Sequence, residues 1–215
     1  DSITASNGSN VIDAGTENDT ITASSGNNTI TAGDGNDTIN LNNGTNSLVA
    51  GSGLDTITAS SGTNTIDAGD DADVITLSGG NNTLSAGSGN DSITATGGTN
   101  TIATDSGNNT VVLNDGTNSV TAGTGADTIT ATGGLNTITA GDGNDTINLN
   151  NGTNSVVAGV GTDTITASSG INTIDAGNDA DVIILNGGNN TVYGASGADS
   201  ITASNGSNVI DAGTE

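Results

Sequence analysis

The chain contains no lysine, arginine or histidine, and its 24 acidic residues give a formal net charge of −24. A protein that binds nucleic acid or an anionic membrane needs positive side chains to neutralise phosphate groups. The composition therefore excludes both kinds of partner. No hydrophobic run is long enough to cross a bilayer, so we expect no membrane insertion. The remaining interpretations of the charge are a solvated acidic surface and a set of cation sites.

Cysteine, proline, methionine, tryptophan and phenylalanine are also absent, and Tyr193 is the only aromatic residue. The lack of cysteine excludes disulfides and thiol chemistry. No histidine, lysine or cysteine is available to activate a serine or threonine nucleophile, so we expect no enzyme activity. A domain of 215 residues usually depends on aromatic side chains for its core. Here the apolar residues are Ile, Val, Leu and Ala, which predicts a thin, repetitive core.

A nine-residue repeat fills the chain. Counted from Asp1 it gives 24 units without insertion or deletion, the last of them one residue short. Position 3 is Ile, Leu or Val in every unit, from Ile3 to Ile210. Five alternating, β-branched residues are followed by four turn residues rich in Gly, Ser and Asn. This pattern predicts a short strand with positions 1, 3 and 5 facing inward and positions 2 and 4 facing solvent.

A period of eighteen residues lies on top of the first. Alternate units begin with Asp and the intervening units begin with Asn, with Asn109 as the one exception. One coil thus comprises two short strands and two turns, and the sequence predicts an all-β parallel solenoid of about 12 coils. Residues 1–17 recur at 199–215. We therefore expect residues 1–215 to form a single uncapped solenoid, a segment of a longer tandem array.

The two edges of the coil predict different chemistry. Stacked inward Asn side chains donate and accept along the axis, which is a self-satisfied ladder. An ionised Asp only accepts, and Asp in every coil places like charges about 5 Å apart. Either protons or cations must then occupy the Asp edge. Oxygen ligands without His or Cys favour Ca²⁺ over a transition metal.

The segment Ala32–Asn40, Ala-Gly-Asp-Gly-Asn-Asp-Thr-Ile-Asn, resembles the calcium-binding nonapeptide of repeats-in-toxin (RTX) proteins. The resemblance implies a right-handed parallel β-roll, as in giant bacterial RTX adhesins and surface fibres, with Ca²⁺ held between coils by Asp carboxylates and turn carbonyls. Gly33, Gly35, Gly141 and Gly143 would shape the turns. The implied metal ligands are Asp19, Asp37, Asp55, Asp73, Asp91, Asp127, Asp145, Asp163, Asp181 and Asp199.

Several turns at the Asp edge depart from the family pattern. The second turn glycine is replaced by an acidic residue at Glu17, Asp71, Asp179 and Glu215. Two further turns are altered, one by Asp105 together with Asn109 and one by Ala195. The acidic replacements either add ligands or disturb the turn, and the sequence leaves both readings open.

We expect a structural, extracellular or cell-surface rod, a module of a bacterial surface filament, adhesin stalk or biofilm matrix fibre that associates end to end. One alternative is ice binding through outward Thr-x-Thr pairs, whose rows resemble those of ice-binding solenoids. The pairs are Thr20/Thr22, Thr56/Thr58, Thr128/Thr130 and Thr164/Thr166. Another alternative is a calcium-triggered secretion or folding module of a larger secreted protein.

Overall fold

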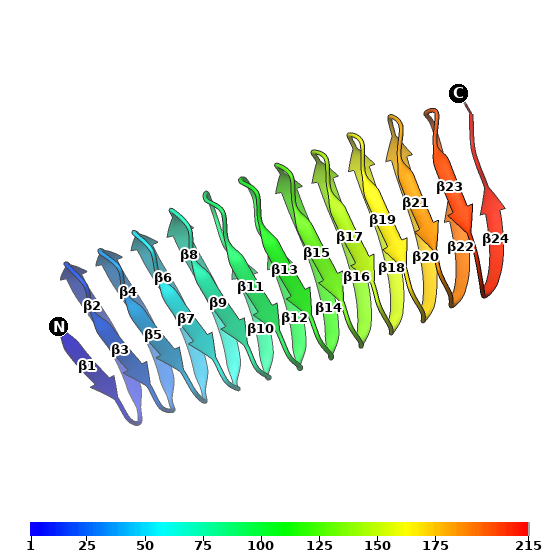
Figure 1. The fold of residues 1–215 in the computed structure, drawn as a ribbon. Coiled ribbons are helices and arrows are strands. Elements are labelled where there is room, and N and C mark those ends of the chain that lie inside the picture. Colours follow the sequence, from blue (N-terminus) through cyan, green and yellow to red (C-terminus); the bar gives the residue numbers. More distant parts are fainter. Residues whose placement is uncertain (215) are drawn as a thin grey trace.

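Two parallel β-sheets make up the computed structural model, which describes residues 1–214. The strands follow one another along a rod, with the N-terminus at one end and the last strand at the other (Figure 1). Odd-numbered strands form sheet A and even-numbered strands form sheet B, each with 12 strands. Among the described residues there is no helix that could cross a membrane.

Sheet A contains β1 (Ser2–Ala5), β3 (Thr20–Ala23), β5 (Thr38–Leu41), β7 (Thr56–Ala59), β9 (Val74–Leu77), β11 (Ser92–Ala95), β13 (Thr110–Leu113), β15 (Thr128–Ala131), β17 (Thr146–Leu149), β19 (Thr164–Ala167), β21 (Val182–Leu185) and β23 (Ser200–Ala203). Sheet B contains β2 (Ser9–Thr16), β4 (Asn27–Asp34), β6 (Thr45–Ser52), β8 (Thr63–Asp70), β10 (Asn81–Ser85), β12 (Thr99–Ala103), β14 (Thr117–Thr124), β16 (Leu135–Asp142), β18 (Thr153–Val160), β20 (Ile171–Asn178), β22 (Asn189–Tyr193) and β24 (Ser207–Asp211).

The register between strands is constant along the rod. In both sheets each residue pairs with the one eighteen positions later, as Ile21 pairs with Ile39 and Asn28 with Asn46. The pairing is parallel throughout, because each strand is followed by a return strand in the other sheet before the chain reaches the next coil. The predicted parallel β-solenoid of about 12 coils is therefore confirmed.

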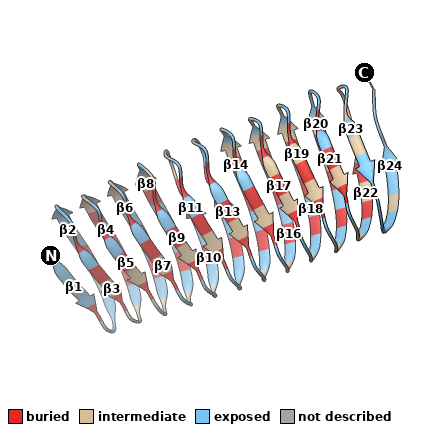
Figure 2. Ribbon diagram, in the orientation of Figure 1, coloured by how far each residue is buried: buried red, intermediate tan, exposed pale blue. Residues whose placement is uncertain are grey.

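The core lies between the two sheets and is one layer of small aliphatic side chains. Ile21, Ala23 and Ile30 are at most 1 % exposed, and the same positions are buried in the other interior coils. In Figure 2 the buried residues form bands that run across successive strands. Every second coil places a leucine, such as Leu41 or Leu77, where its neighbours have alanine. Large and small side chains therefore alternate between layers and fill the narrow space.

Sheet B extends further toward one edge than the repeat predicts. Most of its strands have eight residues, against four in sheet A, because they continue past the inward alanine into the next turn. Gly33 makes this possible, because its φ of 113° is a conformation that glycine adopts readily and other residues seldom do. A Cβ at this position would also collide with the Gly15 carbonyl oxygen. The strands shorten to five residues in β12 and β22, where Asp105 and Ala195 take the place of this glycine, and also in the neighbouring strands β10 and β24.

Candidate calcium edge

The Asn edge of the rod forms a closed hydrogen-bond ladder. The Nδ2 of Asn28 donates to the Oδ1 of Asn46 at 2.7 Å and to the carbonyl of Ser25 at 3.3 Å. The same link between coils repeats without a gap from Asn10 to Asn208. Each amide uses both its donor and its acceptor within the chain, as the sequence predicts. This edge holds itself together and requires no ligand.

The Asp edge uses only half of each carboxylate. The Oδ1 of Asp37 accepts the backbone N–H of Asp19 at 2.7 Å, and the Oδ1 of Asp55 accepts that of Asp37 at 2.8 Å. Every carboxylate of the edge therefore reaches back to the preceding coil. In each case the second oxygen, Oδ2, is buried and has no hydrogen-bond partner. These ten residues, the Asp row, are Asp19, Asp37, Asp55, Asp73, Asp91, Asp127, Asp145, Asp163, Asp181 and Asp199.

Burial makes the charged form unfavourable, and so raises the pKa, in Asp37, Asp55, Asp73, Asp91, Asp127, Asp145, Asp163 and Asp181. Burial, together with the nearby charges of Asp55, Asp91 and Asp71, raises the pKa of Asp73 to about 7. The hydrogen bond from the Asp55 N–H acts in the opposite direction and is outweighed. Burial likewise raises the pKa of Asp163 to about 7 and that of Asp55 to about 6. These carboxylates are therefore costly to ionise, and each also has one buried oxygen without a hydrogen-bond partner.

The donor set of the Asp row fits a hard cation. A partnerless, buried carboxylate oxygen needs either a proton or a metal ion, and the chain offers only oxygen ligands at this edge. Within residues 1–214, no three acidic side chains converge on one point. Successive members of the row belong to different coils, so the carboxylates alone do not complete a coordination shell. The remaining oxygens would come from turn carbonyls or water, both of which Ca²⁺ accepts.

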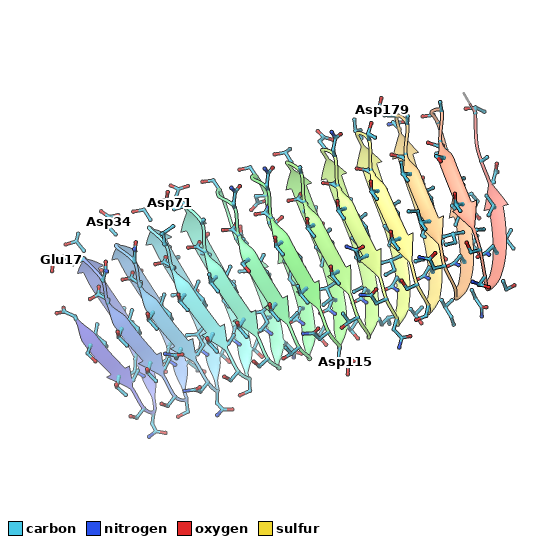
Figure 3. All side chains as sticks on the ribbon, viewed as in Figure 1. Glu17, Asp34, Asp71, Asp115 and Asp179 are labelled. Atoms are coloured by element: carbon cyan, nitrogen blue, oxygen red, sulfur yellow. The ribbon has the colours of Figure 1, made fainter. Side chains whose placement is uncertain are left out.

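The acidic residues that replace the second turn glycine keep the conformation of that glycine. Glu17, Asp71 and Asp179 have φ values of 76–77°, in the left-handed region that non-glycine residues seldom adopt. Their side chains are exposed and are labelled at the outer end of the turns in Figure 3. The turn conformation is therefore preserved, so these replacements do not disturb it. These carboxylates lie in solvent, apart from the buried row.

Sequence reasoning missed two features of the Asp edge. The Asn36 backbone N–H donates to the Asn18 side-chain oxygen at 2.9 Å, and similar links stabilise other turns. The recurrence of Asn just before the row was the available signal. Thr104 is the second feature, a buried hydroxyl at a position where most coils have alanine. The structure also places Asn109 within the row, where it accepts the Asp91 N–H at 2.9 Å.

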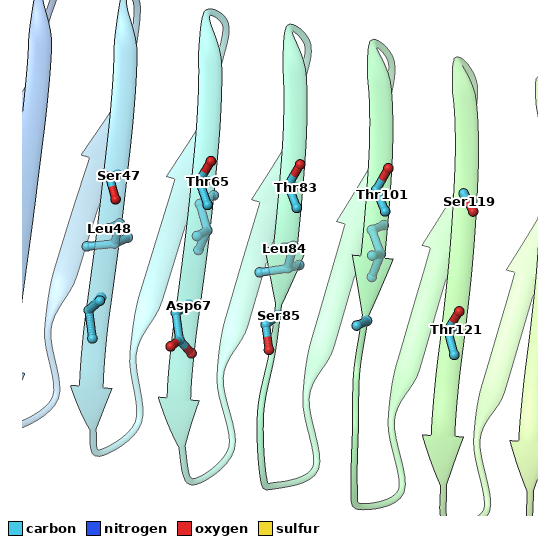
Figure 4. Close-up of a pocket in the computed structure, with 14 residues that line it drawn as sticks. Ser47, Leu48, Thr65, Asp67, Thr83, Leu84, Ser85, Thr101, Ser119 and Thr121 are labelled. Atoms are coloured by element: carbon cyan, nitrogen blue, oxygen red, sulfur yellow. The ribbon is translucent and has the colours of Figure 1, made fainter.

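The outer face of sheet B carries a shallow hollow of about 400 Å³ (Figure 4). Serine and threonine side chains such as Ser47, Thr65 and Thr83 line it, with Asp67 as its only acidic residue. The core residues Leu48 and Leu84 form its floor. Ser85 at this hollow donates its hydroxyl to the Asp105 carboxylate at 2.8 Å, and no histidine, lysine or cysteine is among the lining residues.

The fold and its acidic edge define the class of the protein, a parallel β-solenoid of nonapeptide repeats with a file of buried carboxylates. The sequence matches the RTX calcium-binding nonapeptide repeat over residues 4–39, 13–48, 40–75, 76–111, 112–147, 121–156, 157–192 and 184–214. The chain therefore belongs to this family. No curated protein matches it.

Membership of the family agrees with the site. RTX nonapeptide repeats bind calcium, and the Asp row follows one edge of the solenoid. The fold is a structural, non-catalytic one, and proteins with these repeats are typically secreted or attached to the cell surface. The chain is thus a calcium-binding structural module.

Proposed function

We propose that this module is a calcium-stiffened extracellular rod, a part of a bacterial surface filament, adhesin stalk or biofilm matrix fibre. The observation that carries the proposal is the constant eighteen-residue register, which the parallel pairing keeps from β1 to β23 and from β2 to β24. No insertion interrupts it, so the coils stack into a rod about 55–60 Å long. A repeat protein of this kind contacts itself only between neighbouring coils and acts as a spacer.

The ten carboxylates of the Asp row are the proposed calcium ligands. Each has one buried oxygen without a partner, and each is held in place by the N–H that its other oxygen accepts. A cation shared between coils would satisfy these oxygens and remove the repulsion between adjacent charges. Calcium would then link each coil to the next, which stiffens the rod along its length.

End-to-end association is the proposed mode of contact between copies. Residues 1–17 and 199–215 are identical, so the first coil and the last coil have the same sequence. Open strands in a terminal coil present unpaired N–H and C=O groups, which favour continuation of a sheet. The absence of lysine and arginine argues against nucleic acid as a partner.

The test compares Asp73→Asn with Asp67→Asn. Asp73 belongs to the buried row, whereas Asp67 is exposed on sheet B, so both variants lose one negative charge but only one loses a proposed ligand. Bound calcium is counted by equilibrium dialysis, and particle length is measured by small-angle X-ray scattering with calcium and with chelator. We expect Asp73→Asn to bind less calcium and Asp67→Asn to match the parent. A short or globular parent particle in calcium would contradict the rod, and an unchanged calcium count in Asp73→Asn would contradict the ligands.

Ice binding is supported by one observation, the outward position of the Thr-x-Thr pairs on sheet A. Thr20 is exposed and Thr22 is half-buried on that face. The row is interrupted, however, because Thr22 pairs with Asn40, and Thr94 pairs with Val112. Threonine is also a favoured outward residue in any sheet. Thermal hysteresis and faceted ice crystals would support this second function.

A calcium-triggered secretion or folding module is the third candidate, and the chain's own calcium edge is what favours it. It requires that the chelated chain lose its strands altogether, since the ten like charges are then unscreened. Far-ultraviolet circular dichroism before and after calcium addition distinguishes this from a rod that merely softens.

A further inference from the structure

The coil that contains Thr104 and Asn109 differs from the others at three positions at once. Thr104 takes the place of the usual inward alanine, Asp105 that of the first turn glycine, and Asn109 that of the row aspartate. The structure joins two of them directly, because the Asn109 Nδ2 donates to the Thr104 Oγ1 at 3.1 Å. Both side chains are at most 1 % exposed. The three replacements therefore form one local arrangement.

This arrangement satisfies every polar atom that the other coils of the row leave open. The Asn109 Oδ1 accepts the Asp91 N–H, as an aspartate would. Its Nδ2 stands where the aspartate has its partnerless oxygen, and it also donates to the Gly107 carbonyl at 3.2 Å. The Thr104 hydroxyl in turn donates a hydrogen bond to the Ala122 carbonyl of the next coil at 2.6 Å. Asn109 is accordingly absent from the set of residues with an unsatisfied buried oxygen.

The coil of Ala195 shows that loss of the turn glycine alone does not produce this result. Ala195 replaces the same glycine as Asp105, with a similar φ of 67° against 59°. That coil retains Asp199, whose Oδ2 has no partner. A Cβ at Gly194, the position equivalent to Thr104, would lie 2.6 Å from the Asp199 Oδ2. That separation is a steric clash and not a bonding distance, so the Ala195 coil has no room for the threonine that bonds the row residue in the Thr104 coil.

We propose that the Thr104–Asn109 coil is a calcium-free junction that divides the edge into two separate calcium-binding runs. Each run has five carboxylates, Asp19 to Asp91 on one side and Asp127 to Asp199 on the other. The Asn109 Nδ2 lies where an aspartate of the row has the oxygen that would bind calcium. Because its N–H is a hydrogen-bond donor, it repels a cation at this place. In the junction, the hydrogen bonds of the Thr104 and Asn109 side chains take the place of the calcium ion that we propose for the other coils. This inference rests on the assignment of the Asp row as calcium ligands.

The direct test restores the family pattern with Thr104→Ala combined with Asn109→Asp. The matched control is Thr101→Ala combined with Asn114→Asp, which makes the same chemical changes at two exposed positions. Equilibrium dialysis of the full chain against calcium should show at least one additional bound ion in the first variant and none in the control. An unchanged count in the first variant would overturn the junction. Should that variant fail to fold, the reverse transplant of Ala140→Thr with Asp145→Asn should fold and lose bound calcium, and an unchanged count there would overturn the proposal.

A second readout separates the hydrogen bonds of the junction from its packing. Thr104→Val keeps the shape of the side chain and removes the acceptor of the Asn109 Nδ2. We expect the melting temperature at saturating calcium to fall by about 5 °C while the bound calcium stays constant. Thr101→Val should leave both quantities unchanged.

The failure of the ligand assignment and the failure of the junction give different results. If Asp73→Asn does not lower the amount of bound calcium, the ligand assignment itself is wrong. If Asp73→Asn lowers the amount of bound calcium but Thr104→Ala with Asn109→Asp does not raise it, only the junction is wrong.

Discussion

At the scale of single residues, the two edges of the rod differ by one atom per coil. An Asn side chain brings a donor and an acceptor, so a stack of them is complete, as the links between Asn82, Asn100 and Asn118 show. An Asp side chain brings two acceptors, so one oxygen is always left over. The Asn109 exception follows the same rule, because its extra donor is matched by the acceptor of Thr104.

Replacing Asn100 by Asp should break the Asn ladder irrespective of calcium. The Asn100 Nδ2 donates to the Asn118 Oδ1 at 2.7 Å, and an aspartate there would set two oxygens against each other in a buried place. We expect a loss of about 3 kcal/mol in the free energy of unfolding, measured by denaturant titration at saturating calcium. Asn114→Asp, at an exposed position, is the control. A loss that disappears when calcium is raised would show that this edge binds metal after all.

Replacing Asp71 by Gly should stabilise the rod. Asp71 has a φ of 76°, which costs a non-glycine residue about 1 kcal/mol or more. Glycine adopts this conformation freely, so we expect a gain of about 1 kcal/mol in denaturant titrations. Asp71→Asn removes the same charge and keeps a side chain, so it isolates the electrostatic part of any change. Equal gains in the two variants would mean that charge, and not backbone conformation, sets the cost.

At the scale of the strand and its turn, the raised pKa values predict how stability depends on pH. Burial raises the pKa of Asp73 and Asp163 to about 7 and of Asp55, Asp127 and Asp181 to about 6, against 3.8 for a free aspartate. The calcium-free folded chain thus binds more protons than the unfolded chain between those values. This contribution to stability is complete below pH 3.8 and is lost as the pH rises through 6 to 7.

Thermal unfolding in chelator should therefore give a melting temperature that falls from pH 4 to pH 8. Saturating calcium should remove most of this dependence above pH 7, because the metal then takes the place of the protons. The same titration on Asp73→Asn should show a shallower slope. A melting temperature that rises with pH in chelator would contradict the raised pKa values of the Asp row.

The sequence predicts the coil well because its information is periodic. Ile21 and Ile39 occupy equal places in their units, and the confirmed register follows from that spacing alone. The contact between Thr104 and Asn109 has no such support, because it occurs in one coil and joins residues that seldom vary elsewhere. The extension of sheet B past Ala32 depends on the φ of Gly33, which the residue type permits but does not dictate. The metal ligands and the right-handed sense of the coil remain predictions.

At the scale of the whole molecule, each coil contacts only its two neighbours, so coils can be removed in pairs without disturbing the alternation of leucine and alanine in the core. Deleting residues 127–162 joins Ala126 to Asp163 and preserves the phase of both edges. We expect a folded rod shorter by about 9.6 Å, measured by small-angle X-ray scattering in calcium. Deleting residues 127–135 instead places Asn136 in the Asp row and exchanges the two edges beyond it. The nine-residue deletion should unfold the following coils, and equal stability of the two variants would contradict the distinct roles of the edges.

The direction of the hydrogen bonds between coils determines how the rod responds to a pulling force. Bonds such as that from the Thr38 N–H to the Asp19 carbonyl, 2.9 Å long, join one coil to the next and so run along the long axis. Tension on the two ends therefore breaks these hydrogen bonds one coil at a time, and does not load all of them together in shear. Each coil that opens releases eighteen residues, about 60 Å of slack chain. A tether built this way yields gradually under strain and dissipates a sudden jolt instead of snapping.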